Sequence, residues 1–386
     1  MVPLVRPFRT IFDTLPDFRQ SKGKRHSLAA VLVVVTLGLI NQQNTLGQIA
    51  AWVQGLDWQS RKRLPLRRSQ VPSESTIRRV LRNLDVRVLT EAVQVWVEEV
   101  LAAYFPTADW QGLAIDGKTL RGSRDTVEDL PALQVLNAMV HGLGAFIRSQ
   151  AVPVGTNELG IIQVFLEGLI LRGRVVTLDA LFTHPDIAHT ILDQEGHYLM
   201  RVKANQPRLL EDLQTWFYDP SPFNQAENVV YRQTEKGHGR LVQYTLGTTE
   251  ALNDYLQNEL HWPAVGQAFY VQRRCINLRT GEVTTKTHYA ITSLGFHQAD
   301  PATLLNLWRQ HWDIENKGHW VLDVVFSEDA SKARKDHLPE TLSVLRKAVI
   351  TLLQLFGQDG ITATRSVLSA NVEQAMSLIG LPLDFR

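Results

Sequence analysis

Two aspartates each close a short apolar run, in a setting that suits metal chemistry. Leu113–Ile115 precedes Asp116, and Val175–Leu178 precedes Asp179. Both runs read as strands, and acids at the ends of adjacent strands can converge on one point. A buried lone carboxylate is costly unless it is paired or bound to a metal, and hard cations such as Mg²⁺ or Mn²⁺ prefer oxygen ligands. The two acids together favour a metal site, whereas either aspartate alone would more simply cap a turn.

A third oxygen ligand is expected from the tryptophan-rich segment Leu307–Lys317. With about 100° of rotation per residue in a helix, Glu315 shares a face with four aromatic or imidazole side chains. These are Trp308, His311, Trp312 and His319. Such surroundings favour a polar pocket around Glu315; the simpler alternative is a core tryptophan helix with an outward glutamate.

Four other acids compete for the third position, namely Asp313, Asp323, Glu328 and Asp329. Asp313 lies on the far side of the expected helix from Glu315. Asp323 comes after Gly318, which weakens the helix, and the last two acids follow its expected end. We therefore expect Asp116, Asp179 and Glu315 to be the catalytic metal ligands. His311, Trp312, His319 and Asp323 are expected to support them. Two ions held this way can activate a nucleophile and stabilise a leaving oxygen in phosphodiester transfer.

The positive charge of the chain is concentrated near its beginning. Residues 1–110 carry 15 Lys and Arg against 9 Asp and Glu, so the remaining residues carry 25 against 30. Nine of the early cations fall within residues 61–87: Arg61, Lys62, Arg63, Arg67, Arg68, Arg78, Arg79, Arg82 and Arg87. A basic patch at one end is typical of polyanion binding. A solvated helical face explains the charges equally well when they are taken alone.

Length and composition limit the class of protein. A chain of 386 residues is expected to form two or three structural units. The single cysteine, Cys275, excludes a disulfide framework within the chain and fits a reducing, cytoplasmic location. The longest apolar stretch, Ser27–Ile40, is shorter than the roughly 20 residues that span a bilayer, so we expect a buried helix and no membrane association.

The first part of the chain predicts helices. Ser27–Ile40, Leu46–Trp58 and Asp85–Tyr104 carry apolar residues without the alternation of strands. Ser73 or Ser75 can cap a further helix, Thr76–Leu84. In that helix Arg78, Arg79 and Arg82 lie largely opposite the apolar face, which suits contact with a DNA groove or its phosphates.

The middle of the chain predicts a mixed α/β sheet. The expected strands end near Asp116, Val140, Val154, Asp179 and Val202. Helices are expected over about Glu158–Leu171 and over His184–Gln194. The order β-β-β-α-β-α-β, followed by a strand-rich insertion and more helices, is the order of a ribonuclease H-like core. We expect a helical domain over residues 1–108, and a catalytic domain over 109–386 with its β-rich insertion at about 205–298. Ala302–Trp320 is expected to form one helix, and the tail from Leu338 is also expected to be helical.

Four segments around or near these acids resemble one family. Ala114–Ser123, with the sequence AIDGKTLRGS, resembles the first-aspartate motif of the ISAs-type, H-repeat-associated insertion-sequence transposases of the DDE class. Thr177–Ala180 resembles their second-aspartate motif, and Val202–Pro207 the strand end that follows it. Arg309–Asn316 resembles the third-acid motif. The resemblance extends over nearly the whole chain, including the helical segment around Arg79.

This resemblance implies a ribonuclease H-like DDE core that uses Mg²⁺, or Mn²⁺, to cleave and transfer element ends. It implies two ions per site held by Asp116, Asp179 and Glu315, and no small-molecule cofactor. Its partner would be double-stranded DNA, both element ends and target, bound by a homodimer. The side chains expected to contact DNA are Arg78, Arg79, Arg82, Lys118, Arg121, Lys203, Asn205, His238, Arg240 and Arg309.

The chain departs from the family pattern at a few positions. Val242 and Tyr244 stand where an acid and an arginine are usual, and Gly318 stands where a leucine is usual. These departures concern DNA handling more than the three acids. Two alternatives to an active transposase stay open: a decayed or domesticated copy that binds DNA without cutting it, and a metal-dependent nuclease without strand transfer.

Overall fold

The computed structural model describes residues 5–20, 24–67, 70–106, 110–219, 221–357 and 360–382. By their internal packing the residues form two compact units. Unit 1 consists of Met1–Ala108, Gly117–Glu158 and Asp313–Arg386, and unit 2 of Asp109–Asp116 and Leu159–Trp312. The domain boundary expected at residue 108 lies outside the described residues and stays a prediction.

Unit 1 is mainly helical. Its helices before the sheet are η1 (Phe8–Thr14), α1 (Leu28–Ile40), α2 (Leu46–Gly55), α3 (Trp58–Arg63), α4 (Glu74–Asn83) and α5 (Val86–Tyr104). Its helices after the sheet are η4 (Ile314–His319), α12 (Trp320–Val324), α13 (Leu338–Phe356), α14 (Ile361–Ala370) and α15 (Val372–Leu378). The unit also contains η2 (Arg121–Ser123), β2 (Leu133–Val140) and β3 (Phe146–Ala151).

Local sequence explains where the early helices begin. Ser27, Asp57, Ser73 and Asp85 each accept a backbone N–H at the start of a helix, and Thr45 forms a capping box with Gln48. Of the two serines expected to cap α4, Ser73 does so.

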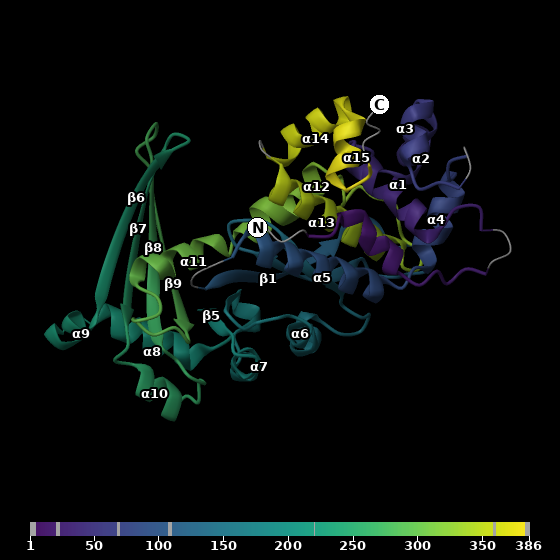
Figure 1. Cartoon of the computed structure of the whole chain (residues 1–386). Helices are drawn as coiled ribbons and strands as arrows, with labels where there is room; N and C mark the ends of the chain where they lie inside the picture. Colours follow the sequence, from purple (N-terminus) through teal and green to yellow (C-terminus); the bar gives the residue numbers. More distant parts are fainter. Residues whose placement is uncertain are drawn as a thin grey trace. The chain divides into compact units, whose positions relative to one another are not determined.

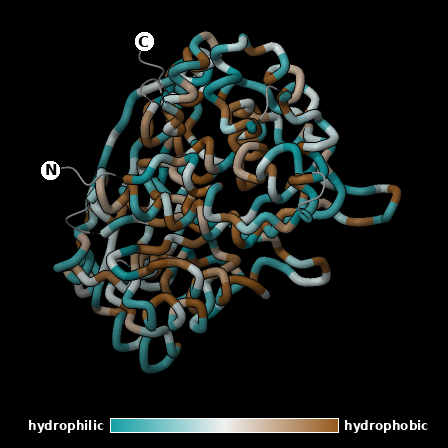
Figure 2. The backbone as a smooth tube through the Cα atoms, turned by 45° about the vertical axis from the view of Figure 1, so that its right-hand side comes forward, coloured by the Kyte–Doolittle hydropathy of each residue, from teal (hydrophilic) through white to brown (hydrophobic). Residues whose placement is uncertain are grey.

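The apolar segment near the start of the chain is a buried helix, as expected. Helix α1 has no polar face, and all but one of its residues are buried against α2, α4, α13 and η1. Among the described residues no helix is long and apolar enough to cross a membrane. Much of the apolar sequence, brown in Figure 2, lies in the interior of the fold.

Unit 2 contains most of the sheet. Its strands are β4 (Arg174–Leu178), β5 (His197–Val202), β6 (Val229–Gly237), β7 (Arg240–Thr249), β8 (Gln267–Asn277) and β9 (Val283–Thr292). Its helices are α6 (Glu158–Glu167), η3 (Ala180–Phe182), α7 (Pro185–Asp193), α8 (Pro207–Tyr218), α9 (Pro222–Glu227), α10 (Asn253–Asn258) and α11 (Pro301–Gln310). The strand β1 (Gln111–Leu120) begins in unit 2 and continues into unit 1.

The strand order is β3-β2-β1-β4-β5-β9-β8-β7-β6. β1 pairs in parallel with β4 and β4 with β5, whereas β2 and β3 are antiparallel. The first five strands therefore have the mixed, ribonuclease H-like order that the sequence predicted. The insertion extends this sheet, because β9 pairs with β5 and carries β8, β7 and β6 with it. Figure 1 shows β6 to β9 as a long ribbon with α11 beside it.

Two expectations about local structure were wrong. β1 runs on to Leu120, so Asp116 lies within the strand rather than at its end. The helix expected over Ala302–Trp320 is broken: α11 ends at Gln310, and Ile314–His319 forms a π-helix before α12. Also, the insertion contains the helices α8, α9 and α10 in addition to strands.

Candidate active site

Asp116 and Asp179 occupy equivalent places on two paired strands. The last paired residues of β1 and β4 are Ile115 and Leu178, and each is followed directly by one of the acids. Pairing with β4 ends at this point although β1 continues, because the chain after Leu178 leaves the sheet at Asp179 and turns into η3. The parallel register therefore brings the two acids to the same level of the sheet.

Glu315 lies in the π-helix that follows α11. π-helical turns are rare, and they occur frequently at functional sites. The next turn packs tightly, since a Cβ atom on Gly318 would meet the Phe146 ring at 2.7 Å and the Met139 sulfur at 3.2 Å. The glycine thus lets this turn lie directly on β2 and β3.

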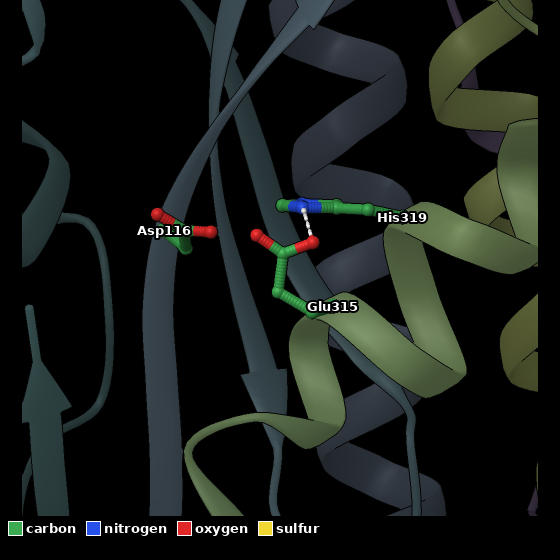
Figure 3. Close-up of side chains that lie close together, drawn as sticks. All are labelled: Asp116, Glu315 and His319. Carbon is green, nitrogen blue, oxygen red and sulfur yellow. Dashed lines mark ion pairs between the residues drawn. The ribbon is translucent and has the colours of Figure 1, made fainter. Parts of the chain in front are cut away.

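Glu315 and His319 face each other within unit 1 (Figure 3). His319 Nδ1 is 3.8 Å from Glu315 Oε2. Burial lowers the pKa of His319, although the Glu315 carboxylate opposes this shift, so the ring is neutral near pH 7. A carboxylate and a neutral imidazole are both side chains that can bind a divalent cation.

The Asp179 carboxylate lies among cations of unit 2. It is 3.5 Å from Arg201 Nη1 and 3.3 Å from Lys203 Nζ. Burial raises the pKa of Asp179, but the backbone N–H of Ala180 and the two cations outweigh this effect, so the pKa lies below its usual value. The carboxylate is therefore ionised at neutral pH.

Arg201 is a residue that sequence reasoning missed. Its guanidinium lies 5.7 and 5.6 Å from the ring centres of Trp308 and Trp312, and Nη2 donates to Nδ1 of His288 at 2.8 Å. Burial and the nearby cations lower the pKa of His288 to about 4, so this ring is a neutral acceptor. A lone arginine within the apolar strand expected over Tyr198–Val202 was the available signal.

A second residue that was missed is Glu158, at the start of α6. A Cβ atom on Gly117 would lie 1.8 Å from Glu158 Oε1, so in this arrangement the glycine leaves room for the carboxylate to lie against β1. Burial raises the pKa of Glu158. The close approach of the Glu158 carboxylate is thus one structural reason for glycine at position 117 in the AIDG sequence.

Three of the residues expected to support the acids have defined partners. His311 Nδ1 lies 2.9 Å from the Thr177 hydroxyl on β4, and Trp312 packs against Trp308. Asp323 differs from the expectation, because both of its oxygens accept from Lys118 Nζ, at 2.8 and 2.7 Å. Lys118 was expected to contact DNA, but it is buried in this ion pair.

The competing acids have structural partners. Asp313 accepts from the Gly142 N–H and from Lys317. Glu328 is buried with its carboxylate 3.5 Å from Arg346. Asp329 accepts from the Arg121 N–H.

The arginines of α4 line a surface hollow. Arg78, Arg79 and Arg82 surround it together with Ser73, Ser75 and neighbouring residues, and its volume is about 570 Å³. The apolar face of the helix is buried, as expected. Arg78 is paired with Glu74 and Arg82 with Asp336, both at exposed positions.

The wider basic patch is less uniform than its sequence suggested. Arg63 is buried, where it donates to the Pro382 carbonyl, so it does not belong to a solvated surface. Arg68 lies outside the described residues.

The other side chains expected to contact DNA fall into two groups. Arg121, Lys203, His238 and Arg240 are exposed. Asn205 and Arg309 are engaged within unit 2: Asn205 donates to the Ala180 carbonyl at 2.6 Å, and Arg309 binds both oxygens of Glu235 and lies over the Tyr244 ring. The unusual Tyr244 thus packs against an arginine of the third-acid motif.

Comparison with known families decides the classification. The family described as Transposase DDE domain matches residues 109–352, and the family described as DDE_Tnp_1-associated matches residues 9–97. The chain belongs to the DDE transposase family. The first of these matches includes all three expected acids, so the resemblance seen in the sequence motifs is confirmed.

Relatives are similar over most of their length. A protein of Escherichia coli O157:H7 named as a candidate transposase, YncI, is 26% identical over 89% of this chain and 86% of its own. The H repeat-associated protein YhhI of E. coli K12, also named as a candidate transposase, is 28% identical over 88% of each chain. A cryo-EM structure of the piggyBac transposase synaptic complex with hairpin DNA aligns with a TM-score of 0.46 and 12% identity, over 96% of this chain and 76% of that one.

Proposed function

We propose that this DDE transposase cleaves the ends of an insertion sequence and joins them to target DNA, with divalent metal ions held by Asp116, Asp179 and Glu315. The observation that carries the proposal is the register of β1 and β4, which sets Asp116 and Asp179 at the same level of two paired strands, in a chain whose family match includes all three acids. Carboxylate oxygens are the ligands that divalent cations such as Mg²⁺ and Mn²⁺ prefer.

The residues fit Mg²⁺ or Mn²⁺. Asp116 and Glu315 supply hard oxygen ligands, and Asp179 stands at the same level of the sheet on the strand paired with β1. Two bound ions would activate the attacking oxygen and stabilise the leaving oxygen of the phosphodiester. Arg201 and Lys203 keep Asp179 ionised, which a metal ligand requires.

The remaining proposed roles concern DNA. Arg78, Arg79 and Arg82 line a hollow that suits phosphate groups, and Arg121 and Lys203 are exposed cations. The partner would be double-stranded DNA at element ends and at the target. A homodimer would hold two ends together, and His238 and Arg240 at the tip of the ribbon would add phosphate contacts.

The test is an assay with the DNA that flanks this gene, in Mg²⁺, in Mn²⁺ and in EDTA. We expect metal-dependent nicking at the element ends, and strand transfer when pre-cut ends are supplied. Glu315→Gln should abolish both reactions and retain DNA binding in EDTA. Glu259→Gln, at an exposed site just after α10, is the matched control.

Two results would replace the proposal. Cleavage without transfer of pre-cut ends would indicate a metal-dependent nuclease. Binding of the ends without cleavage in either metal would indicate a decayed or domesticated DNA-binding protein.

A further inference from the structure

Behind Glu315 a chain of buried polar side chains runs into the core of unit 1. It begins at His319 on η4 and passes through Asn137 on β2 and Ser149 on β3. It ends at Lys347 in the middle of α13, which is 2% exposed. Polar side chains inside a core are retained at a cost, so a connected series of four calls for a physical role.

Each link of this chain has a defined distance. Lys347 Nζ donates to Ser149 Oγ at 2.7 Å, and Ser149 Oγ donates to Asn137 Oδ1 at 2.9 Å. Asn137 Nδ2 lies 3.4 Å from His319 Nε2. On the other side of the ring, His319 Nδ1 faces the Glu315 carboxylate at 3.8 Å.

The lysine determines the direction of these hydrogen bonds. A lysine ammonium has three donors and no acceptor, so the Ser149 oxygen must accept from it. This uses one of the two lone pairs of Ser149 Oγ, and the hydroxyl proton is donated to the amide oxygen of Asn137. The NH₂ group of Asn137 is therefore turned toward His319.

A second contact fixes the same orientation of the amide independently. Asn137 Nδ2 lies 3.4 Å from the backbone carbonyl of Val135, which can only accept. If the amide were flipped, two oxygens would face each other here. The Val135 carbonyl therefore decides the assignment, and the Ser149 hydroxyl is compatible with it.

The tautomer of His319 follows from this orientation. An NH₂ group facing Nε2 requires that Nε2 be the acceptor, and a neutral imidazole then carries its proton on Nδ1. We propose that Lys347, acting through Ser149 and Asn137, holds His319 as the Nδ1–H tautomer, so that His319 is a positioning donor to Glu315 and not a metal ligand. The part concerning Glu315 rests on the proposed function.

The chemistry of the alternatives supports this assignment. A histidine that ligated a metal through Nδ1 would have to be unprotonated there. Here Nδ1 is the nitrogen on the side of Glu315, and an N–H aimed at one carboxylate oxygen leaves the other oxygen to a cation. A donor behind a ligating carboxylate is a common way of orienting it. Burial also lowers the pKa of Lys347, to about 8, so the lysine is still a cationic donor at neutral pH.

The direct test is the ¹⁵N spectrum of the histidine rings in the full-length protein, without metal or DNA. The His319 signals are identified by their loss in His319→Gln. We expect Nδ1 protonated and Nε2 unprotonated. Protonation of Nε2 alone would overturn the proposal.

A nearly isosteric variant tests whether residue 137 controls the ring. In Asn137→Asp an oxygen faces Nε2, so the proton should move to Nε2. An unchanged Nδ1–H tautomer in a folded Asn137→Asp protein would show that the chain of side chains does not set it, and would overturn the proposal.

The effect on Glu315 is tested by Mn²⁺ binding to the DNA-free protein. Ser149→Ala should weaken binding by about tenfold, as is typical when a group orienting a ligand is removed. Ser149→Thr keeps the hydroxyl and should restore it. Asn41→Leu, which removes a buried amide elsewhere in unit 1, is the matched control. Equal Mn²⁺ affinity in the Ala and Thr variants would remove the positioning role of the chain.

These measurements separate the inference from the proposed function. If Glu315→Gln binds Mn²⁺ as tightly as the wild type, Glu315 is not a ligand and the proposed metal site fails. The ring spectra of the wild type and Asn137→Asp still decide the tautomer in that case.

Discussion

The carboxylate of Asp179 lies between the cations Arg201 and Lys203, whereas that of Glu315 faces the neutral ring of His319. Asp179 is thus neutralised within its own unit before any ion arrives. Glu315 is more exposed, and behind it stands a buried series of donors. If both acids hold metal as proposed, they are prepared in opposite ways: Asp179 by direct charge compensation and Glu315 by orientation.

The strongest effects should come from changes to Asp179 and Glu315. Both acids are expected to be essential for cleavage, so the free energy of unfolding of the variants, rather than their activity, should distinguish them. Asp179→Asn and Glu315→Gln should each lower cleavage at least about a hundredfold, because several kcal/mol of charge stabilisation disappears. Asp179→Asn leaves part-buried Arg201 without its carboxylate and should also cost about 1–3 kcal/mol in urea unfolding. Glu315→Gln should stay within about 0.5 kcal/mol. Equal destabilisation by the two variants would contradict the contrast between the acids.

The next effect concerns Arg201 itself. Arg201→Met keeps much of the contact with Trp308 and Trp312 but removes the charge beside Asp179, and should slow cleavage by about 10- to 100-fold. Arg201→Lys should recover part of the activity, because it restores the charge without the planar stack. Arg172→Met, at an exposed ion pair with Glu195, is the control. Full activity of Arg201→Met would mean that Asp179 needs no compensation.

A weaker effect is expected in DNA binding, which should be independent of both acids. Replacing Arg78, Arg79 and Arg82 by alanine should weaken binding of element ends. It should also flatten the log–log salt dependence by up to about 0.9 for each phosphate that the protein no longer neutralises. Arg63→Ala should destabilise the fold instead, because Arg63 is buried. An unchanged salt slope in the triple variant would show that α4 presents only a solvated face.

The last predicted effect is a change of stability with pH that comes from Lys347, the buried lysine behind Glu315. Burial lowers the pKa of Lys347 from 10.5 to about 8, so between these values the unfolded chain holds a proton that the folded chain lacks. The free energy of unfolding should therefore rise with pH across this window, by at most about 3 kcal/mol from this group. Lys347→Met should lack the rise, and its stability relative to wild type should fall from about pH 8 to about pH 10. Parallel stability curves for the two proteins would contradict this prediction.

Much of the fold could be predicted from the sequence because its signals are local. Ser73 capping α4, the unbroken apolar run of α1 and the short apolar strands before Asp116 and Asp179 are each visible within a few residues. Asp116 and Asp179 were predicted from these strand ends and Glu315 from a helical segment, and the family motifs pointed to the same three acids. Their roles in catalysis stay predictions.

What could not be predicted depends on contacts between distant residues. The sequence motif suggested that Lys118 is free to contact DNA. In the structure it is paired with Asp323, which lies 205 residues further along the chain. The contacts of Arg201 on β5 with His288 on β9 and with Trp308 on α11 form only when these three elements pack together. The π-helix around Glu315 and the close packing of Gly318 against Phe146 cannot be seen from a helical pattern with a fixed rotation per residue.

The close packing of Gly318 also bears on how this chain can change by mutation. The family resemblance leads us to expect leucine at this position, yet any side chain here would meet the Phe146 ring. The two sites are therefore epistatic. Gly318→Leu alone would overpack the turn that carries Glu315, at a cost of about 1–3 kcal/mol, whereas the same change after Phe146→Ala would find space. A change to leucine at position 318 should therefore be tolerated better after Phe146 has been replaced than before, so the order of the two substitutions matters as well as their identity.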